Sequence, residues 1–392
     1  MADPMNTAAA GRRASRRGHV AAGVAACALL LAACSSNKDA VKPTPLAEIR
    51  GAIPVRTVWR ASLPKAPDAF MQPAVTDDAV YAAGGDGTIV RLDPSSGRVV
   101  WRVDAKSPLS AGVGSDGTTV AVATAKGEVL AYGSDGKPRW KAQVASDVVV
   151  PPLVGRGLVV VRSTDHRISA FSSDSGKREW MYQRQTPPLS LRVSTPLVFD
   201  GDNVVGGFPG GRLVAVSLAN GAMRWEATVS EPNGATEVER LADVTGSIAV
   251  GARDLCAASY QGRVMCIDAT GTGERWARTL AAGAGVAFDD QRVFAVDQAS
   301  AVVAYTRDAG ASVWRTSALA NRRLSSPLAQ GRWVAVGDFE GYVHFLAAAD
   351  GALIARAKTD GTAIVAAPQA LADGVVVQTR DGSVELLVPG AR

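Results

Sequence analysis

The stretch QPAVTDDAVYAAGGDGTIVRLDPSSGRVVWRV, residues 72–103, decides the fold. It contains four short runs rich in β-branched and aromatic residues, separated by turn residues that include Gly85-Asp86-Gly87 and Gly97. Short runs of this kind, bounded by Gly, Asp and Ser, predict antiparallel strands joined by tight turns. The fourth run carries Trp101. The segment therefore predicts one small four-stranded sheet.

The same unit recurs from about residue 55 onward, and tryptophans mark its period. They are spaced by 42, 39, 40, 45, 51 and 38 residues: Trp59, Trp101, Trp140, Trp180, Trp225, Trp276 and Trp314. A turn glycine stands four residues before five of them: Gly97, Gly136, Gly176, Gly221 and Gly310. The next fourth strand on this period is GALIARA, residues 351–357, in which Ala355 occupies the tryptophan position.

The turn between the second and third strands gives an independent count of eight units. His166 and Ser300 occupy two of these turns. Glycine occupies the other six: Gly87, Gly127, Gly211, Gly262, Gly341 and Gly382. In every copy the residues two and five positions later are apolar. A period near 40 with four strands per unit is typical of a β-propeller, so the sequence predicts an all-β fold with eight blades.

The two ends of the repeat region complement each other. The last unit, residues 367–388, supplies only three strands, whereas Thr57-Val58-Trp59-Arg60-Ala61 is a lone fourth strand near the start. Pairing them would close the ring and remove both free sheet edges. We therefore predict one propeller over residues 55–392, with the tryptophans locking neighbouring blades together in the core.

The first 33 residues have the pattern of a signal peptide. Four arginines precede the apolar run Val20 to Ala33, which is too short to span a membrane. The run ends in Leu31-Ala32-Ala33-Cys34, which resembles the lipobox of bacterial lipoproteins. This resemblance implies cleavage before Cys34, lipidation (palmitate) of that cysteine, and, because Ser35 rather than Asp follows it, sorting to the outer membrane.

Residues 34–54 are predicted to be the lipidated cysteine and a flexible tether, because SSNKDAVKPTPLAEIRGAIP is polar and contains prolines. Charge gives little information about partners. Residues 1–33 hold four Arg and one Asp, so the remaining chain has 38 basic and 36 acidic residues. This near balance does not suggest a nucleic-acid partner.

Several segments outside the repeat markers resemble the BamB family, the propeller lipoproteins of the BAM complex, which folds and inserts outer-membrane β-barrels. The resemblance covers essentially residues 35–392 and is carried by PPLSLRVSTP (187–196), GATEVERLADV (234–244), VAFDDQRVFAVDQASAVVAY (286–305) and LSSPLAQGRWVAVGDFEGYVHFLAAADG (324–351). It implies a non-enzymatic scaffold that is anchored in the outer membrane and faces the periplasm. The implied partners are a POTRA domain of BamA, other BAM subunits and unfolded outer-membrane proteins.

The repeat also resembles that of quinoprotein dehydrogenases, so an enzyme or a quinone- or sugar-binding sensor is the alternative. Such enzymes are longer, hold calcium, and often carry two adjacent cysteines. Here Cys34, Cys256 and Cys266 are not adjacent, and only His166 and His344 follow the signal peptide, too few histidines for a zinc site on their own. We predict no catalytic residue, no metal and no cofactor, and bound quinone in purified protein would favour the alternative.

The BamB resemblance also implies two partner-binding loops. Leu189, Leu191 and Arg192 match the first loop's motif, although Val193 replaces its usual glycine. Asp243 matches the first acid of the second loop, but Thr245 replaces the second acid, so we expect a weaker contribution there. Both segments are long connections between blades, where function often lies. Without the resemblance, the two leucines could equally pack on a blade edge.

Cys256 and Cys266 flank the turn Tyr260-Gln261-Gly262. A three-residue loop would place Cys256 opposite Cys266, close enough for a disulfide, and the periplasm is oxidising. A two-residue turn would instead place Cys256 opposite Ile267. We predict the disulfide, with a structural rather than a redox role.

Overall fold

The computed structural model describes residues 41–65, 70–185, 187, 189–191, 195–270 and 273–390. The chain divides into two units, Met1–Lys42 and Pro43–Arg392, and all of the named strands belong to the second. The predicted signal peptide, Cys34 and Arg192 lie outside the described residues. Within the described ranges, no helix has the length and apolar character needed to cross a membrane.

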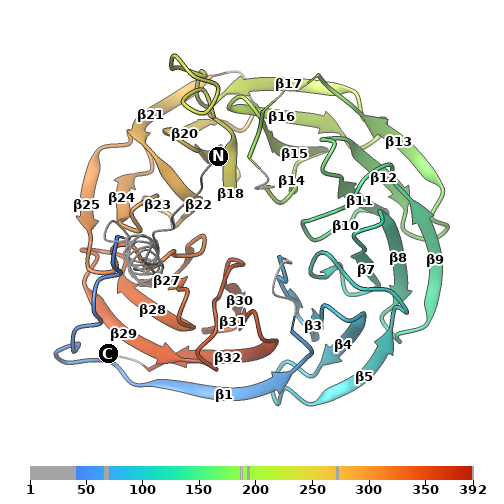
Figure 1. Cartoon of the computed structure of the whole chain (residues 1–392), viewed down its shortest axis with the longest axis horizontal. Helices are drawn as coiled ribbons and strands as arrows, with labels where there is room; N and C mark the ends of the chain where they lie inside the picture. Colours follow the sequence, from blue (N-terminus) through green and yellow to red (C-terminus); the bar gives the residue numbers. More distant parts are fainter. Residues whose placement is uncertain are drawn as a thin grey trace, which may run out of the picture. The chain divides into compact units, whose positions relative to one another are not determined.

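The strands of the second unit form eight four-stranded antiparallel sheets arranged as the blades of a propeller (Figure 1). This confirms the predicted fold class. Blade one contains β2 (Ala74–Thr76), β3 (Ala79–Ala83), β4 (Thr88–Leu92) and β5 (Val99–Asp104). Its strands coincide with the four runs that residues 72–103 predict.

The remaining blades repeat this order, with the bounds that follow. Blade two has β6 (Gly114–Ser115), β7 (Thr119–Ala123), β8 (Glu128–Gly133) and β9 (Pro138–Gln143). Blade three has β10 (Leu153–Gly155), β11 (Leu158–Arg162), β12 (Ile168–Ser172) and β13 (Arg178–Tyr182). Blade four has β14 (Val198–Asp200), β15 (Asn203–Phe208), β16 (Arg212–Ser217) and β17 (Met223–Thr228).

Blade five has β18 (Val244–Val250), β19 (Asp254–Ser259), β20 (Gly262–Asp268) and β21 (Glu274–Leu280). Blade six has β22 (Ala282–Phe288), β23 (Arg292–Asp297), β24 (Val302–Thr306) and β25 (Ser312–Thr316). Blade seven has β26 (Leu328–Gln330), β27 (Trp333–Gly337), β28 (Tyr342–Ala347) and β29 (Leu353–Lys358). Blade eight joins β30 (Gln369–Leu371), β31 (Gly374–Gln378) and β32 (Ser383–Pro389) to β1 (Val55–Ser62).

Blade eight closes the ring as the sequence predicts. Its strand order is β1-β32-β31-β30, and β1 pairs antiparallel with β32, with Thr57 opposite Leu387 and Ala61 opposite Val384. The first and last strands of the chain thereby give each other a hydrogen-bonding neighbour that neither would otherwise have.

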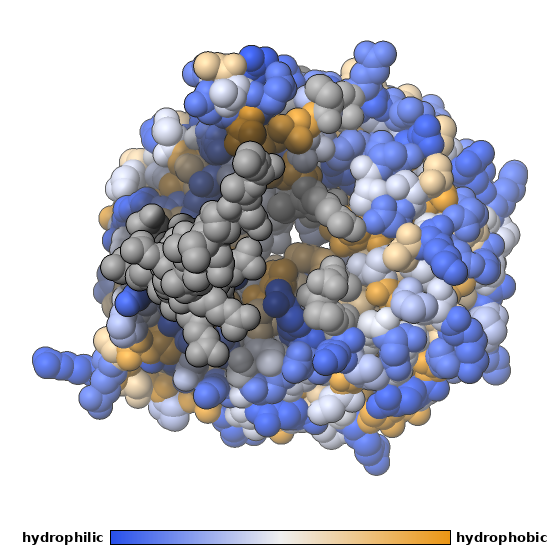
Figure 2. Space-filling model, in the orientation of Figure 1, coloured by the Kyte–Doolittle hydropathy of each residue, from blue (hydrophilic) through white to orange (hydrophobic). Residues whose placement is uncertain are grey.

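Burial follows the position of a strand within its blade. The second strand β3 is buried at every residue, whereas the outer strand β5 alternates between exposed and half-buried residues. Inner strands lie between neighbouring blades and therefore need apolar residues on both faces, whereas an outer strand has one face in water. Figure 2 shows one face of the ring, with mostly hydrophilic residues around its rim and hydrophobic residues gathered closer to the centre.

Tryptophans lock six of the eight described blades to the next through a hydrogen bond and a close ring contact. In six blades the indole Nε1 donates to a backbone carbonyl of the following blade at 2.7–2.9 Å: Trp59, Trp101, Trp140, Trp180, Trp276 and Trp314. A turn glycine of that next blade lies against the ring, so that a Cβ there would come within 2.4–3.0 Å of it: Gly97, Gly136, Gly176, Gly221, Gly310 and Gly351. The paired recurrence of Gly and Trp in the sequence is thus the contact between blades.

Cys256 and Cys266 are directly opposite each other on β19 and β20, fully buried, with their sulfurs joined. The register is the one that a three-residue loop predicts. The left-handed residue of this turn is Gln261, with φ of 51°. Oxidation of the pair in the periplasm stays a prediction, which mass spectrometry of the non-reduced protein checks.

Candidate functional site: two long connections on one face

The two predicted loops are the connections that enter and leave blade four. Residues 183–197 join β13 to β14, and residues 229–243 join β17 to β18. Because the four strands of a blade alternate in direction, every connection between blades emerges on the same face as the turns between second and third strands. We call this side the connection face. It carries both loops.

One buried carboxylate joins the two loops. Asp243, at the end of the second loop, is 4% exposed. Its Oδ2 accepts a hydrogen bond from the backbone N–H of Leu191 at 2.6 Å, and its Oδ1 accepts one from the N–H of Gly210 at 3.1 Å. Charge-assisted bonds to backbone donors are among the stronger hydrogen bonds in proteins. Asp243 therefore fixes the path of the first loop from beneath.

The first loop has two leucines at or next to this hydrogen bond, Leu189 and Leu191. Leu189 is 41% exposed, which is unusual for a leucine of the described residues, and Leu191 is half-buried. Arg192 follows immediately but lies outside the described residues. The described part of the loop thus presents the apolar side chain of Leu189 to solvent on a backbone that Asp243 holds at Leu191.

A buried arginine underlies the same region. Arg162, at the end of β11, is 4% exposed; one guanidinium nitrogen donates to the carbonyl of Gly207, and the group stacks over the Phe208 ring at 4.6 Å. Its Nε has no hydrogen-bond partner among the described residues. Burial lowers the pKa of Arg162 to about 10, although the charge of Asp243 acts in the opposite direction, so the group stays protonated at neutral pH.

His166 connects Arg162 to the first loop. It occupies the turn position at which six of the other blades have glycine and blade six has Ser300, with φ of 63°. Burial first, and the charge of Arg162 second, lower the pKa of His166 below 6.5, so the ring is neutral at pH 7. Arg162 lies 3.3 Å from Nδ1 and can only donate, so Nδ1 accepts and the ring proton lies on Nε2, 3.5 Å from the Ser190 hydroxyl oxygen.

The second loop is ordered by its own side chains. Glu239 accepts bonds from the N–H groups of Ala235 and Thr236 at 2.8 and 3.0 Å, and those bonds lower the pKa of its carboxyl. Arg240 pairs with Glu237 at 3.1 Å. Val238 between them is 61% exposed. The loop is therefore a compact projection with an apolar residue at its surface.

The family motif does not predict Arg162, His166 or Val238. A signal for Arg162 does exist in the repeat: four positions before the turn glycine, the other seven units have Ala, Gly, Val or Gln. Of the residues that the motif names, Leu191 and Asp243 are joined by a hydrogen bond, and their role in binding a partner stays a prediction. Thr245 is 4% exposed and belongs to β18, so it adds no surface charge. Within the described ranges, no group of three or more His, Cys, Asp or Glu is placed to hold a metal ion.

Comparison with known proteins places this geometry in a family. A family model described as "Outer membrane protein assembly factor BamB" matches residues 56–109, 85–316 and 298–387. The chain is 44% identical over 363 residues to the outer membrane protein assembly factor BamB of Bordetella pertussis, covering 92% of this chain and 94% of that one. It is 45% identical over 362 residues to the BamB of Burkholderia pseudomallei, covering 92% and 95%.

Solved structures agree. The crystal structure of BamB from Moraxella catarrhalis superposes with a TM-score of 0.79 at 28% identity, covering 85% of this chain and 99% of that one. The quinohemoprotein alcohol dehydrogenase of Comamonas testosteroni superposes with a TM-score of 0.68 at 15% identity, covering 86% and 77%, a likeness of fold alone. On the family match, the relatives and the propeller itself, the chain belongs to the BamB family of outer membrane protein assembly factors.

Proposed function

We propose that this protein is a non-enzymatic, lipid-anchored scaffold that binds a periplasmic POTRA domain of BamA through the loops 183–197 and 229–243. Membership of the BamB family supports a role in outer-membrane protein assembly. The observation that carries the binding site is the Asp243 carboxylate, which holds the loop with exposed Leu189 in a fixed path. A surface that is ordered before binding loses little conformational entropy on association.

The roles of the loop residues follow from their placement. Leu189 fills an apolar depression on BamA, Arg192 pairs with an acid there, and Val238 adds a second apolar contact from the other loop. Asp243 is too deeply buried to offer a contact surface, so it supports binding by positioning Leu191. Anchoring is a separate part of the proposal: Cys34→Ala should abolish incorporation of labelled palmitate, and undiminished labelling would disprove the lipobox assignment.

The test is retention of BamA in pull-downs of single-residue variants. Leu189→Ala and Arg192→Ala should each weaken binding about thirtyfold, because truncating an apolar or arginine anchor costs about 2 kcal/mol or more. Val313→Ala on β25 of blade six is the matched control, because Val313 is also 41% exposed. Wild-type retention of BamA by Leu189→Ala/Leu191→Ala/Arg192→Ala, with an unchanged melting temperature, would refute the interface.

Substitution of Asp243 tests whether the path of the first loop matters for binding. Asp243→Ala removes the acceptor of the Gly210 N–H in a buried bond and of the Leu191 N–H in a partly buried one, and a buried group left without a partner costs about 1–3 kcal/mol. We expect faster hydrogen exchange in residues 189–191 together with weaker BamA binding. Asp202→Ala, in the exposed turn between β14 and β15, is the control. Normal BamA binding by Asp243→Ala despite a loosened loop would show that the path of the loop is irrelevant.

A further inference from the structure

The segment expected to be a flexible tether is attached to the ring over residues 44–54. The backbone N–H of Thr44 donates to the carbonyl of Ala320 at 2.9 Å, in the connection between blades six and seven. Leu46 packs against the apolar cluster between the same two blades. Ile53 is 7% exposed, and its N–H donates to the carbonyl of Ile354 on β29 at 2.8 Å. We call residues 44–54 the docked segment.

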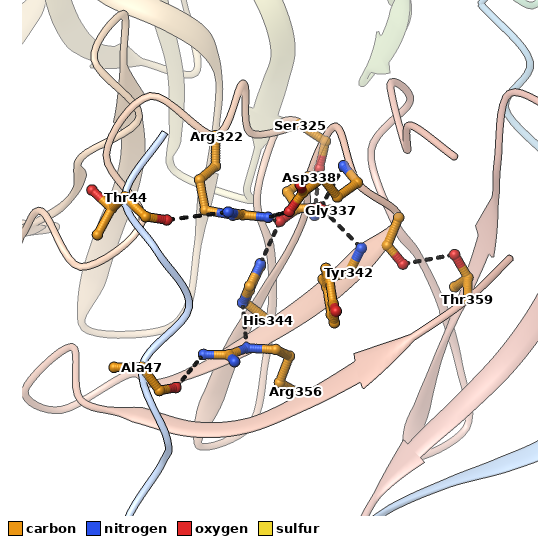
Figure 3. Close-up of polar contacts among 12 residues, drawn as sticks. Thr44, Ala47, Arg322, Ser325, Gly337, Asp338, Tyr342, His344, Arg356 and Thr359 are labelled. Carbon is orange, nitrogen blue, oxygen red and sulfur yellow. Dashed lines mark hydrogen bonds and ion pairs between the residues drawn. The ribbon is translucent and has the colours of Figure 1, made fainter. Parts of the chain in front are cut away.

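Two arginines hold the docked segment by its backbone (Figure 3). Arg322 Nη1 donates to the carbonyl of Thr44 at 3.1 Å, and Arg356 Nη2 donates to the carbonyl of Ala47, also at 3.1 Å. Figure 3 shows both side chains reaching from the ring to the same stretch of chain. Proline at position 45 restricts Thr44 to extended conformations, which lowers the entropy lost on docking.

The arginines are themselves fixed by a buried polar network. Arg322, whose side chain is 3% exposed, donates from Nε to Asp338 Oδ2 at 2.7 Å and also pairs with Glu340. His344 lies 2.9 Å from the same Asp338 oxygen, and Arg356 donates to its other ring nitrogen at 3.3 Å. Of these five residues, Asp338 and His344 have fully buried side chains.

The backbone on both sides of Arg322 has an unusual conformation. Asn321 and Arg323, the residues on either side, both have left-handed conformations, with φ of 61° and 49°. A non-glycine residue rarely adopts this conformation, and an arginine less readily than an asparagine. Strain of this kind persists where the surrounding structure fixes a functional geometry.

We propose that the network of Arg322, Asp338, His344 and Arg356 is a docking site for the segment that follows the lipidated cysteine. The proposal rests on the proposed lipid anchor only for its consequence: docking shortens the stretch of chain between the lipidated cysteine and the ring, which we call the leash. Thr44 lies ten positions after Cys34, an extended reach of about 35 Å, whereas Val55 lies 21 positions after it, a reach of about 70 Å. Thr44 docks at a connection between blades, so the leash starts from the connection face, which also carries the partner loops.

Trypsin cleavage between Arg50 and Gly51 measures release of the docked segment in the non-lipidated mature chain. Arg356→Ala and Leu46→Ser should each raise the cleavage rate about tenfold, the effect of losing one charged hydrogen bond or one packed side chain. Neither substitution leaves a buried charge without a partner of opposite charge. The control is Arg278→Ala on β21, an outer-strand arginine that also donates to a backbone carbonyl, that of Ala309, at 2.8 Å.

Hydrogen exchange of residues 44–54 gives a second readout. The proposal requires protected amides at Thr44 and Ile53 in the wild type, loss of protection at Thr44 in Arg356→Ala, and an unchanged melting temperature of the ring in Leu46→Ser, which leaves the His344 network intact. Wild-type cleavage as fast as that of a free peptide with this sequence, or an unaltered rate in both variants, would overturn it. Because these measurements need no lipid, they can fail independently of the palmitate labelling that tests the anchor.

Discussion

At the scale of single residues, His344 should make stability depend on pH. Burial lowers its pKa below 6.5, although the hydrogen bond and charge of Asp338 act in the opposite direction; Arg356 and Arg322 lower it further. An unfolded chain takes up the proton at about pH 6.5, the folded protein only at lower pH. Stability that is fully present above pH 6.5 is therefore lost as the pH falls through the folded pKa.

The measurement compares thermal melts at about pH 7.5 and about pH 5. The melting temperature of the wild type should fall more between these values than that of His344→Gln, which cannot titrate. The pKa of Asp338 is lowered from its ordinary 3.8, chiefly by bonds from His344 and the Tyr342 N–H that outweigh its burial, so Asp338 stays charged across this range. His166 is present in both proteins, so its effect on the melting temperature cancels in the comparison. Equal falls would show that His344 does not contribute.

Which residues form the candidate site was partly predictable from the sequence, but their roles were not. The family motif singles out Leu189, Leu191 and Asp243. It cannot show that the Asp243 carboxylate points inward to the Leu191 N–H, because that direction depends on how two distant connections pack. Arg162 has only a weak signal, an arginine where other units have small or uncharged residues.

At the scale of the strand and turn, the contact between glycine and tryptophan can be separated from the effect of a left-handed backbone. Gly176 and Gly157 have nearly the same φ, 70° and 77°. A Cβ at Gly176 would lie 2.6 Å from the ring of Trp140, whereas one at Gly157 would meet nothing within 4 Å. Gly157→Ala should cost about 1–2 kcal/mol of unfolding free energy, the cost of an alanine in this conformation.

Gly176→Ala should cost several kcal/mol in all, because the ring of Trp140 must move and its bond to the Ser173 carbonyl, 2.7 Å long, is strained. Urea denaturation of the two variants provides the comparison. Trp140→Ala sets the upper scale, on the order of 3–5 kcal/mol for removing a core aromatic. Equal losses from Gly157→Ala and Gly176→Ala would mean that the contact between blades adds nothing to stability.

The strands were predictable because each unit repeats the same local pattern. The docked segment could not be predicted, because its contacts are distant in sequence. SSNKDAVKPTPLAEIRGAIP has the polar, Pro-containing composition of a linker. Its order depends on Arg322 and Arg356, about 280 and 310 residues further along the chain. Composition alone cannot reveal a binding site of this kind.

At the scale of the whole molecule, the closure explains the one unit that lacks its tryptophan. Blade eight takes its outer strand from the other end of the chain, so it has no turn between its third and fourth strands and no turn glycine to cover an indole. Ala355 stands at that position in blade seven, fully buried. Ile53, just before β1, packs in the same apolar cluster. The departure from the repeat is thus a consequence of the way the ring closes.

Among the eight described sheets, the pairing of β1 with β32 is the one place where no turn joins the third strand to the fourth, and we call it the seam. An ion pair crosses this seam. Arg60 of β1 contacts both oxygens of Glu385 of β32, at 2.9 and 3.0 Å, and the Glu385 side chain is fully buried. Arg60→Ala leaves that carboxylate buried, with the Ser383 hydroxyl as its remaining side-chain partner among the described residues. We expect a loss of about 3 kcal/mol, the lower end of the range for breaking a buried pair, because Arg60 is half exposed.

Arg315→Ala in blade six is the matched control for Arg60→Ala, because its partner Asp297 is 9% exposed and Arg315, like Arg60, is 50% exposed. Asp297 also keeps the N–H of Ala301 at 2.7 Å, and its blade is continuous in sequence. Guanidinium denaturation followed by tryptophan fluorescence should show a larger loss for Arg60→Ala, shared by all blades in one transition. Arg60→Ala/Glu385→Gln should recover part of it, because no buried charge remains. Equal losses in Arg60→Ala and Arg315→Ala would mean that the seam is no weaker than any other part of the ring.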